Sequence, residues 1–141
     1  MIPSAFTGTY SYRALHNDPD LDRAFGELRF ATGRMDLRET APGQVEGRVT
    51  GEGWGTWTEW FLNLRGQCFF GEPNALLLRG TNVIAGEMWI YDYRGYLMPR
   101  WPGADRERDV IVGSVIRSSS RKLHDAQAGL FASFYAVRQA D

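Results

Sequence analysis

The chain has 141 residues and a net charge of −1, and 43% of its residues are hydrophobic. This length is enough for one domain with a sizeable core, so we predict a single β-barrel domain over residues 1–141. The balanced, interspersed charges argue against nucleic acid or a membrane as a partner. The single cysteine, Cys68, excludes an internal disulfide and a cysteine-based zinc site, and we expect it to be a small buried residue.

The N-terminal residues lack the basic start and apolar core of a signal peptide. No apolar stretch approaches the ~18 residues that a membrane-spanning helix needs. We therefore expect a cytoplasmic protein.

The chain begins with a strand-like alternation over residues 6–14, in which Tyr10 and Tyr12 share one face. Asp18 stands before a proline, which is the pattern of a helix N-cap followed by the first helical residue. We expect a single helical turn at residues 20–24.

Three strands are predicted next. Apolar and charged residues alternate in each of them, which is typical of an antiparallel sheet with one wetted face. These strands are residues 25–31, 34–40 and 44–51, joined by short turns at 32–33 and 41–43.

The second half of the chain consists of longer apolar and aromatic runs. Strands are predicted at residues 54–64, 74–81, 84–93, 109–117 and 129–138, with turns at 71–74 and 81–82, a tight turn or bulge at 94–95, a proline-rich loop at 99–105 and a helix at 118–128. We count eight main strands and one optional short one. Because closure hides strand edges, we predict an all-β fold, an eight-stranded antiparallel up-and-down barrel with short helical connections.

The acidic residues near the first connection do not form a calcium loop. Asp18, Asp20 and Asp22 have the spacing of such a loop's start, but Arg23 and Arg29 stand where it requires glycine and glutamate.

Two histidines, His16 and His124, lie in predicted connections. A metal site would require them to meet an acid such as Asp18 or Asp125. No nucleophile elbow, Walker loop or dinucleotide-binding glycine pattern occurs in the chain. We predict neither a metal nor a cofactor.

The most distinctive polar cluster lies in the predicted strand at residues 84–93. Glu87, Trp89, Tyr91 and Tyr93 share one face, and Met88, Ile90 and Asp92 share the other. If the first face lines the lumen, a carboxyl group lies among rings, where desolvation raises its pKa toward values useful in acid–base chemistry. If the second does, the lumen is apolar with Asp92 near its rim. Alternatively, the cluster is an outer face whose rings pack on arginine stems.

The same choice arises in residues 54–64 for the face that holds Trp57, Glu59, Phe61 and Asn63. Arg100 and Trp101 lie in the proline-rich loop. An arginine beside an indole can clamp a carboxylate, stack on a planar ligand or plug the barrel end.

Several stretches in the last third of the chain resemble segments of small bacterial and fungal proteins of unassigned function. They are residues 89–97, 99–102, 112–117 and 132–138. In fold, the chain is similar to lipocalin-like (calycin) barrels and to small barrel cyclases of natural-product biosynthesis. It lacks the lipocalin Gly-x-Trp signature, because residues 6–10 read FTGTY. The resemblance therefore implies an architecture and carries over no catalytic residue.

We predict that the barrel binds a small apolar or aromatic molecule in its lumen, as a cofactor-free cyclase or isomerase if it is an enzyme. The assigned residues are Glu87, Glu59, Tyr91 and Tyr93 for catalysis and Trp57, Trp60, Trp89, Asp92, Arg100 and Trp101 for ligand binding. The alternatives are a non-catalytic carrier or sensor, and an interaction module whose barrel is filled by its own rings and which exposes an apolar patch. Homodimerisation through an outer sheet face is compatible with the sequence.

Overall fold

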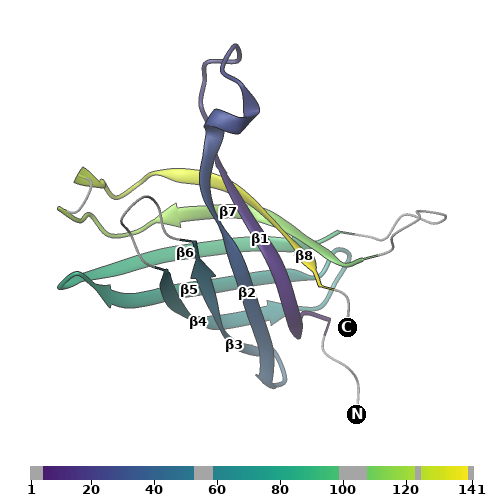
Figure 1. Ribbon diagram of the computed structural model, residues 1–141. Helices are drawn as coiled ribbons and strands as arrows, with labels where there is room; N and C mark the ends of the chain where they lie inside the picture. Colours follow the sequence, from purple (N-terminus) through teal and green to yellow (C-terminus); the bar gives the residue numbers. More distant parts are fainter. Residues whose placement is uncertain (1–4, 53–58, 99–107, 123–124, 140–141) are drawn as a thin grey trace.

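The computed structural model describes residues 5–52, 59–98, 108–122 and 125–139. Its strands are β1 (Gly8–His16), β2 (Arg29–Ala41), β3 (Gln44–Gly51), β4 (Trp60–Phe69), β5 (Ala75–Ile84), β6 (Glu87–Leu97), β7 (Val110–Arg117) and β8 (Phe131–Arg138), and a short 3-10 helix, η1 (Phe25–Leu28), precedes β2. Each strand pairs antiparallel with the next, and β8 pairs with β1 (Figure 1). The predicted eight-stranded up-and-down barrel is confirmed.

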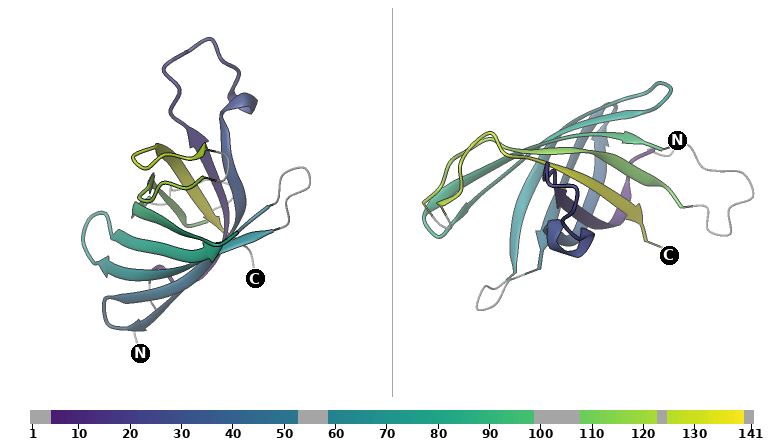
Figure 2. Two further views of the ribbon diagram at one scale, coloured as in Figure 1. Left: turned by 90° about the vertical axis from the view of Figure 1, so that its left-hand side faces the viewer. Right: turned by 90° about the horizontal axis from the view of Figure 1, so that it is seen from above.

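The barrel has two ends that differ in chemistry. One end is formed by the last residues of β1, β3, β5 and β7 and the first residues of β2, β4, β6 and β8, and we call it the tryptophan end because Trp60 and Trp89 lie close to it. The opposite end is where β1 begins and β8 finishes, and we call it the terminal end. Figure 2 shows the β1–β2 connection, which contains η1, extending well beyond the strands at the tryptophan end.

The core occupies the inside of the barrel. Inward-facing residues alternate with outward-facing ones along the strands, as in Tyr10, Tyr12 and Ala14 of β1. The middle is filled by three rings, because Tyr12, Tyr93 and Phe134 lie with their centroids 5.7 to 6.3 Å apart. Burial raises the pKa of both tyrosines. These rings pack the barrel centre.

Several predicted strands match the structure. The strand at residues 44–51 coincides with β3, including the inward direction of Val45 and Val49. The turn before it is also confirmed, since β2 ends at Ala41 and β3 begins at Gln44. The predicted runs at 109–117 and 129–138 become β7 and β8. Cys68 is buried in β4, as expected.

The prediction of two strands at residues 25–31 and 34–40 is wrong. Residues 25–28 form η1, and β2 runs without interruption through the expected turn at 32–33. Gly33 pairs with Tyr12 on one side and with Gly51 on the other, so the ladder holds it extended. In place of the expected helical turn at 20–24, residues 20–23 form a single turn in which the Arg23 N–H donates to the Asp20 carbonyl at 3.2 Å, and Asp18 Oδ1 accepts the Asp20 N–H just before it at 2.8 Å.

Two further predicted breaks are also strand interior. Thr81 and Asn82 lie within β5, opposite Ile90 and Trp89 of β6. The chain instead turns at residues 85–86, both of which have positive φ. Residues 94–95 continue β6 rather than turning. Strands β5 and β6 are longer than their turn-forming residues indicate. Pairing with a neighbouring strand on each side outweighs the weak preference of these residues for turns.

The helix predicted at residues 118–128 is wrong for the part of that segment that the structure describes. Arg121 and Ala126 form a β-bridge there. Ser119 Oγ accepts the N–H of Ile90 at 2.9 Å, so this serine binds the edge of β6 instead of starting a helix. The predicted loop at 99–105 lies outside the described residues. No helix in the described part of the chain is long and apolar enough to cross a membrane.

Candidate functional site

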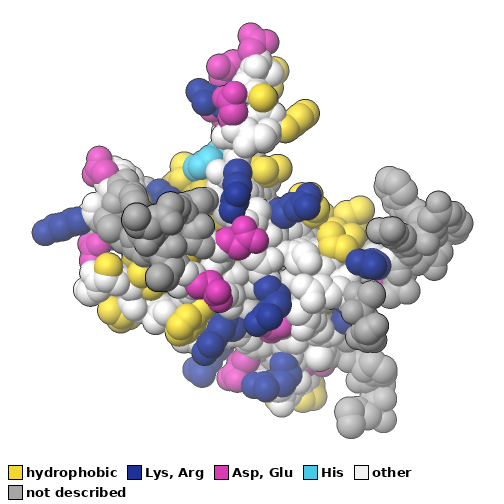
Figure 3. All heavy atoms as spheres, viewed as in Figure 1, with side chains coloured by type: hydrophobic (Ala, Val, Ile, Leu, Met, Phe, Trp, Pro, Cys, Tyr) yellow, Lys and Arg dark blue, Asp and Glu magenta, His cyan; other side chains and the backbone are white. Residues whose placement is uncertain are grey.

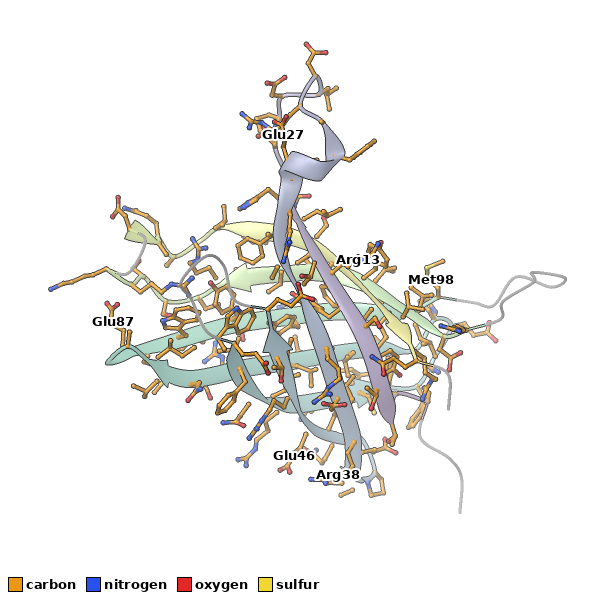
Figure 4. All side chains as sticks on the ribbon, viewed as in Figure 1. Arg13, Glu27, Arg38, Glu46, Glu87 and Met98 are labelled. Atoms are coloured by element: carbon orange, nitrogen blue, oxygen red, sulfur yellow. The ribbon has the colours of Figure 1, made fainter. Side chains whose placement is uncertain are left out.

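The inner face of β6 carries the aromatic side chains of the tryptophan end. Trp89, Tyr91 and Tyr93 have exposed fractions of 5%, 5% and 2%, so the first of the two predicted faces lines the barrel. Glu87 lies on the same face at the start of β6, at the rim (Figure 4). Its Oε1 accepts the backbone N–H of Lys122 at 2.8 Å, which ties the β7–β8 connection to this rim.

Trp60 reaches the same end from the first residue of β4. Its indole lies against Gly51 of β3, where an added Cβ would overlap the indole ring atoms. The missing side chain at Gly51 therefore makes room for the indole. The Trp60 and Trp89 rings have centroids 6.3 Å apart. Trp60 is half-buried, while Trp89 packs deeper in the barrel.

Phe30 and His16 form the adjoining wall. Their ring centroids lie 5.0 Å apart in an edge-on arrangement, and Phe30 lies 6.3 Å from Tyr91. Burial lowers the pKa of His16, and the charge of Arg117 lowers it further. The imidazole is thus uncharged at neutral pH, and it extends the aromatic wall rather than adding a charge.

Two arginines complete the site. Arg117, the last residue of β7, donates from Nε to the Tyr91 hydroxyl at 3.1 Å and from Nη1 to the Gln127 carbonyl at 3.4 Å. The Cζ of Arg121 lies 3.4 Å from the centre of the Trp89 ring and 5.5 Å from that of Tyr91. These distances are typical of cation–π contacts. The site therefore combines aromatic walls with two guanidinium groups.

The remaining predicted site residues do not belong to this group of side chains. Asp92 is on the outer face of β6, paired with Arg79 at 2.8 Å and accepting the Ser118 hydroxyl at 2.6 Å. These hydrogen bonds, that of Arg79 first, lower the pKa of Asp92. Glu59 is exposed just before β4. Tyr93 belongs to the packed centre of the barrel. Trp57, Arg100 and Trp101 lie outside the described residues.

The outer surface of β2 to β5 carries a separate hollow of about 760 Å³. It is shallow and lies among outward-pointing charged side chains, including Arg38 and Glu46, which Figure 4 shows on the outside of the barrel. Figure 3 shows basic and acidic side chains interleaved over the face of the barrel that is turned toward the viewer. This hollow is a gap between solvated side chains and contains none of the predicted site residues.

Sequence reasoning missed the roles of Phe30, Arg117 and Arg121. The position of Arg117 carried a usable signal, because it lies two residues after the inward-facing Val115 and so shares its strand face. Arg121 had none, since its segment reads as a helix. Within the described part of the chain, no three His, Cys, Asp or Glu side chains gather as metal ligands do, and His124 lies outside that part.

Comparisons with known proteins support the fold alone. A solved structure of a redesigned beta barrel, b11L5F_LGL, superimposes with a TM-score of 0.52, covering 95% of this chain and 91% of that one. The two sequences are 10% identical, so the likeness concerns architecture. No protein-family model and no curated protein matches the chain. The resemblance to calycins thus extends no further than the β-barrel.

Proposed function

We propose that the protein binds a small aromatic or apolar molecule at the tryptophan end of the barrel. The observation that carries this proposal is the gathering of Trp60, Trp89, Tyr91 and Phe30 at one barrel end. Flat aromatic walls with a few polar groups are characteristic of small-molecule sites, and barrel mouths are a common place for them. Carrier, sensor and enzyme remain alternative uses of this site.

The packing of the barrel favours its end over its centre as the binding position. Tyr12, Tyr93 and Phe134 occupy the middle with mutual ring contacts. Trp60, Phe30 and the two arginines are only half-buried, so a ligand can reach them. We therefore propose that the lumenal ligand predicted from the sequence lies against these rings, beyond the packed centre.

Binding is tested with N-phenyl-1-naphthylamine, a neutral aromatic probe that fluoresces in apolar surroundings. We expect saturable binding to one site in the wild-type protein. Replacing Trp60 with leucine should weaken it about fivefold, because one aromatic contact of ~1 kcal/mol is lost. Fluorescence titration and calorimetry measure the dissociation constant and the number of sites.

Phe69→Leu is the matched control, since Phe69 is a half-exposed ring on the outside of the same strand. It should leave probe binding unchanged. Equal weakening by both substitutions, or the absence of a saturable site, would contradict the proposal. Circular dichroism of each variant confirms that the barrel is folded.

An interaction module is the second candidate, and one observation favours it. Phe69, Ala75, Tyr96 and Val112 follow one another across the outside of β4 to β7. Phe69 and Tyr96 are each about half exposed, at 51% and 53%. This row resembles surfaces that bind other proteins. The probe titration separates the candidates, because an interaction module provides no saturable site that Trp60→Leu weakens.

Cyclisation or isomerisation stays a prediction from the sequence. Both predicted acid–base residues lie at the tryptophan end, but Glu87 lies on the inner face of β6 at the rim, whereas Glu59 is exposed just before β4. A chemical step would require the substrate to lie between Glu87 and the aromatic walls.

A further inference from the structure

Arginine 121 is the feature of the tryptophan end that aromatic binding alone does not explain. Its Nε and Nη1 atoms are buried and have no hydrogen-bond acceptor among the described residues. Burying a cation without an acceptor is costly, and ring stacking compensates for only part of the lost hydration. Unsatisfied buried donors are rare in folded proteins and call for an explanation.

The electrostatics around this guanidinium favour an anion. Burial is the largest cause that lowers the pKa of Arg121, and the charge of Arg117 lowers it further, whereas Tyr91, partly through a side-chain hydrogen bond, and Glu87 raise it. Within the described ranges, neither arginine forms an ion pair with a carboxylate. Glu87 is the nearby acid whose charge acts on Arg121, and its Oε1 already accepts the Lys122 N–H. Two cations thus share one end with a carboxylate that is engaged elsewhere.

Arg138 at the terminal end shows how the same side chain is satisfied within this protein. Its Nε pairs with Asp109 Oδ2 at 3.0 Å, and its Nη2 donates to the Ala5 carbonyl and to the Tyr10 hydroxyl, each at 2.9 Å. Its Nη1 donates to the Thr7 carbonyl. The comparison identifies what Arg121 lacks, an anionic oxygen in the position that Asp109 occupies beside Arg138.

We propose that the ligand of the tryptophan end is an aromatic oxyanion, whose charged group binds Arg121 and whose ring lies against Trp60, the half-buried indole beside Trp89. This inference rests on the proposed function and specifies its ligand class. Guanidinium groups bind carboxylate, sulfonate and phosphate oxygens through charge-assisted hydrogen bonds. Stacking on Trp89 fixes the position of the guanidinium before the ligand binds. The ligand's oxygens then serve as the missing hydrogen-bond acceptors, and its ring replaces water on the aromatic wall.

A pair of matched probes tests the charge separately from the ring. N-phenyl-1-naphthylamine is neutral, and 8-anilinonaphthalene-1-sulfonate has the same aromatic skeleton with a sulfonate added. We expect the wild-type protein to bind the sulfonate at least tenfold more tightly than the neutral probe. Arg121→Gln should remove most of that preference and change the affinity for the neutral probe by less than threefold.

Arg94→Gln is the control, because Arg94 is an exposed arginine on the outside of β6. Arg94→Gln changes the net charge by the same amount as Arg121→Gln. It should leave the affinities for the neutral probe and for the sulfonate probe unchanged. Arg121→Lys should keep part of the preference, since the charge remains. A titration against benzoate and phenyl phosphate, each displacing the bound sulfonate probe, then distinguishes a carboxylate ligand from a phosphate ligand.

The outcomes separate the two proposals. If neither probe binds at a saturable site, the proposed function fails. If both bind equally, or if Arg121→Gln weakens both to the same extent, aromatic binding stands and the oxyanion inference is wrong. Loss of preference in Arg94→Gln as well would show that general surface charge attracts the sulfonate, and this too would overturn the inference.

Discussion

The contact between Cys68 and Glu39 shows how one partly buried pair sets the chemistry of a side chain. The Cys68 thiol donates to Glu39 Oε1 at 3.0 Å, and the same oxygen accepts the Gly43 N–H at 3.3 Å. Burial raises the pKa of Cys68 to about 11, and the Glu39 carboxylate contributes to the increase. Because the thiolate is the reactive form, this thiol is held in an inert state at neutral pH.

Replacing Glu39 with glutamine should make Cys68 more reactive. The change removes a negative charge beside the thiol, so the pKa of Cys68 falls, and each unit raises the thiolate fraction about tenfold below the midpoint. The measurement is the rate of alkylation by iodoacetamide against pH. The midpoint of that profile should shift downward, which an effect of accessibility alone would not produce.

Glu46→Gln is the control for Glu39→Gln. Glu46 lies on the outside of β3 and pairs with the exposed Arg65 at 3.6 Å. Its removal should leave the alkylation profile unchanged. An unaltered midpoint in Glu39→Gln would show that burial alone determines the state of the thiol.

At the scale of single elements, strand β7 depends on a close approach to β6. Gly113 of β7 pairs with Gly95 of β6, and a Cβ added at Gly113 would overlap the Arg94 carbonyl oxygen. Rigid backbone cannot move aside as the tip of a side chain can. Glycine at a strand interior often marks such a close backbone approach or a sharp bend of a barrel.

Gly113→Ala should therefore destabilise the barrel by about 1–3 kcal/mol, the usual cost of forcing an extra carbon into a packed position. Urea denaturation followed by tryptophan fluorescence measures the free energy of unfolding. Gly26→Ala is the control, because nothing lies within 4 Å of a Cβ placed there. It should change stability by less than about 1 kcal/mol, and an equal loss in both variants would contradict the steric argument.

The elements also show which parts of this fold a sequence can reveal. Val45 and Val49 alternate with charged residues, so the inward face of β3 is readable directly. Both faces of β6 carry apolar side chains, since Met88 is half exposed and Trp89 buried, and the pattern alone could not choose between them. The position of Arg121 at the tryptophan end follows from the hydrogen bond between Ser119 and Ile90 of β6. These residues are far apart in the sequence, so no local pattern predicts the contact.

The whole molecule divides its chemistry between two ends. At the terminal end, Arg138 joins β8 to the start of the chain through Asp109, Tyr10 and carbonyl oxygens. Burial raises the pKa of the Tyr10 hydroxyl to about 12, so this hydroxyl keeps its proton while it accepts the hydrogen bond from Arg138. At the tryptophan end, the corresponding donors of Arg121 lack acceptors. One end thus closes the barrel internally, while the other is completed by a ligand in our proposal.

This division predicts that stability depends on the terminal end. Arg138→Gln breaks the pairing with Asp109 and the contacts that hold residues 5–10 against β8. The pair is largely buried, with side-chain exposures of 26% and 16%. Removing one partner of such a pair should lower the free energy of unfolding by about 2–4 kcal/mol, somewhat below the cost for a fully buried pair. Urea denaturation provides the measurement, and Arg65→Gln, whose side chain is 83% exposed, should cost less than about 1 kcal/mol. Arg121→Gln should preserve or raise stability, because it removes a guanidinium whose buried Nε and Nη1 atoms lack hydrogen-bond acceptors. If Arg121→Gln destabilised the barrel as much as Arg138→Gln, the guanidinium at the tryptophan end would be a structural plug, and the difference between the two ends would disappear.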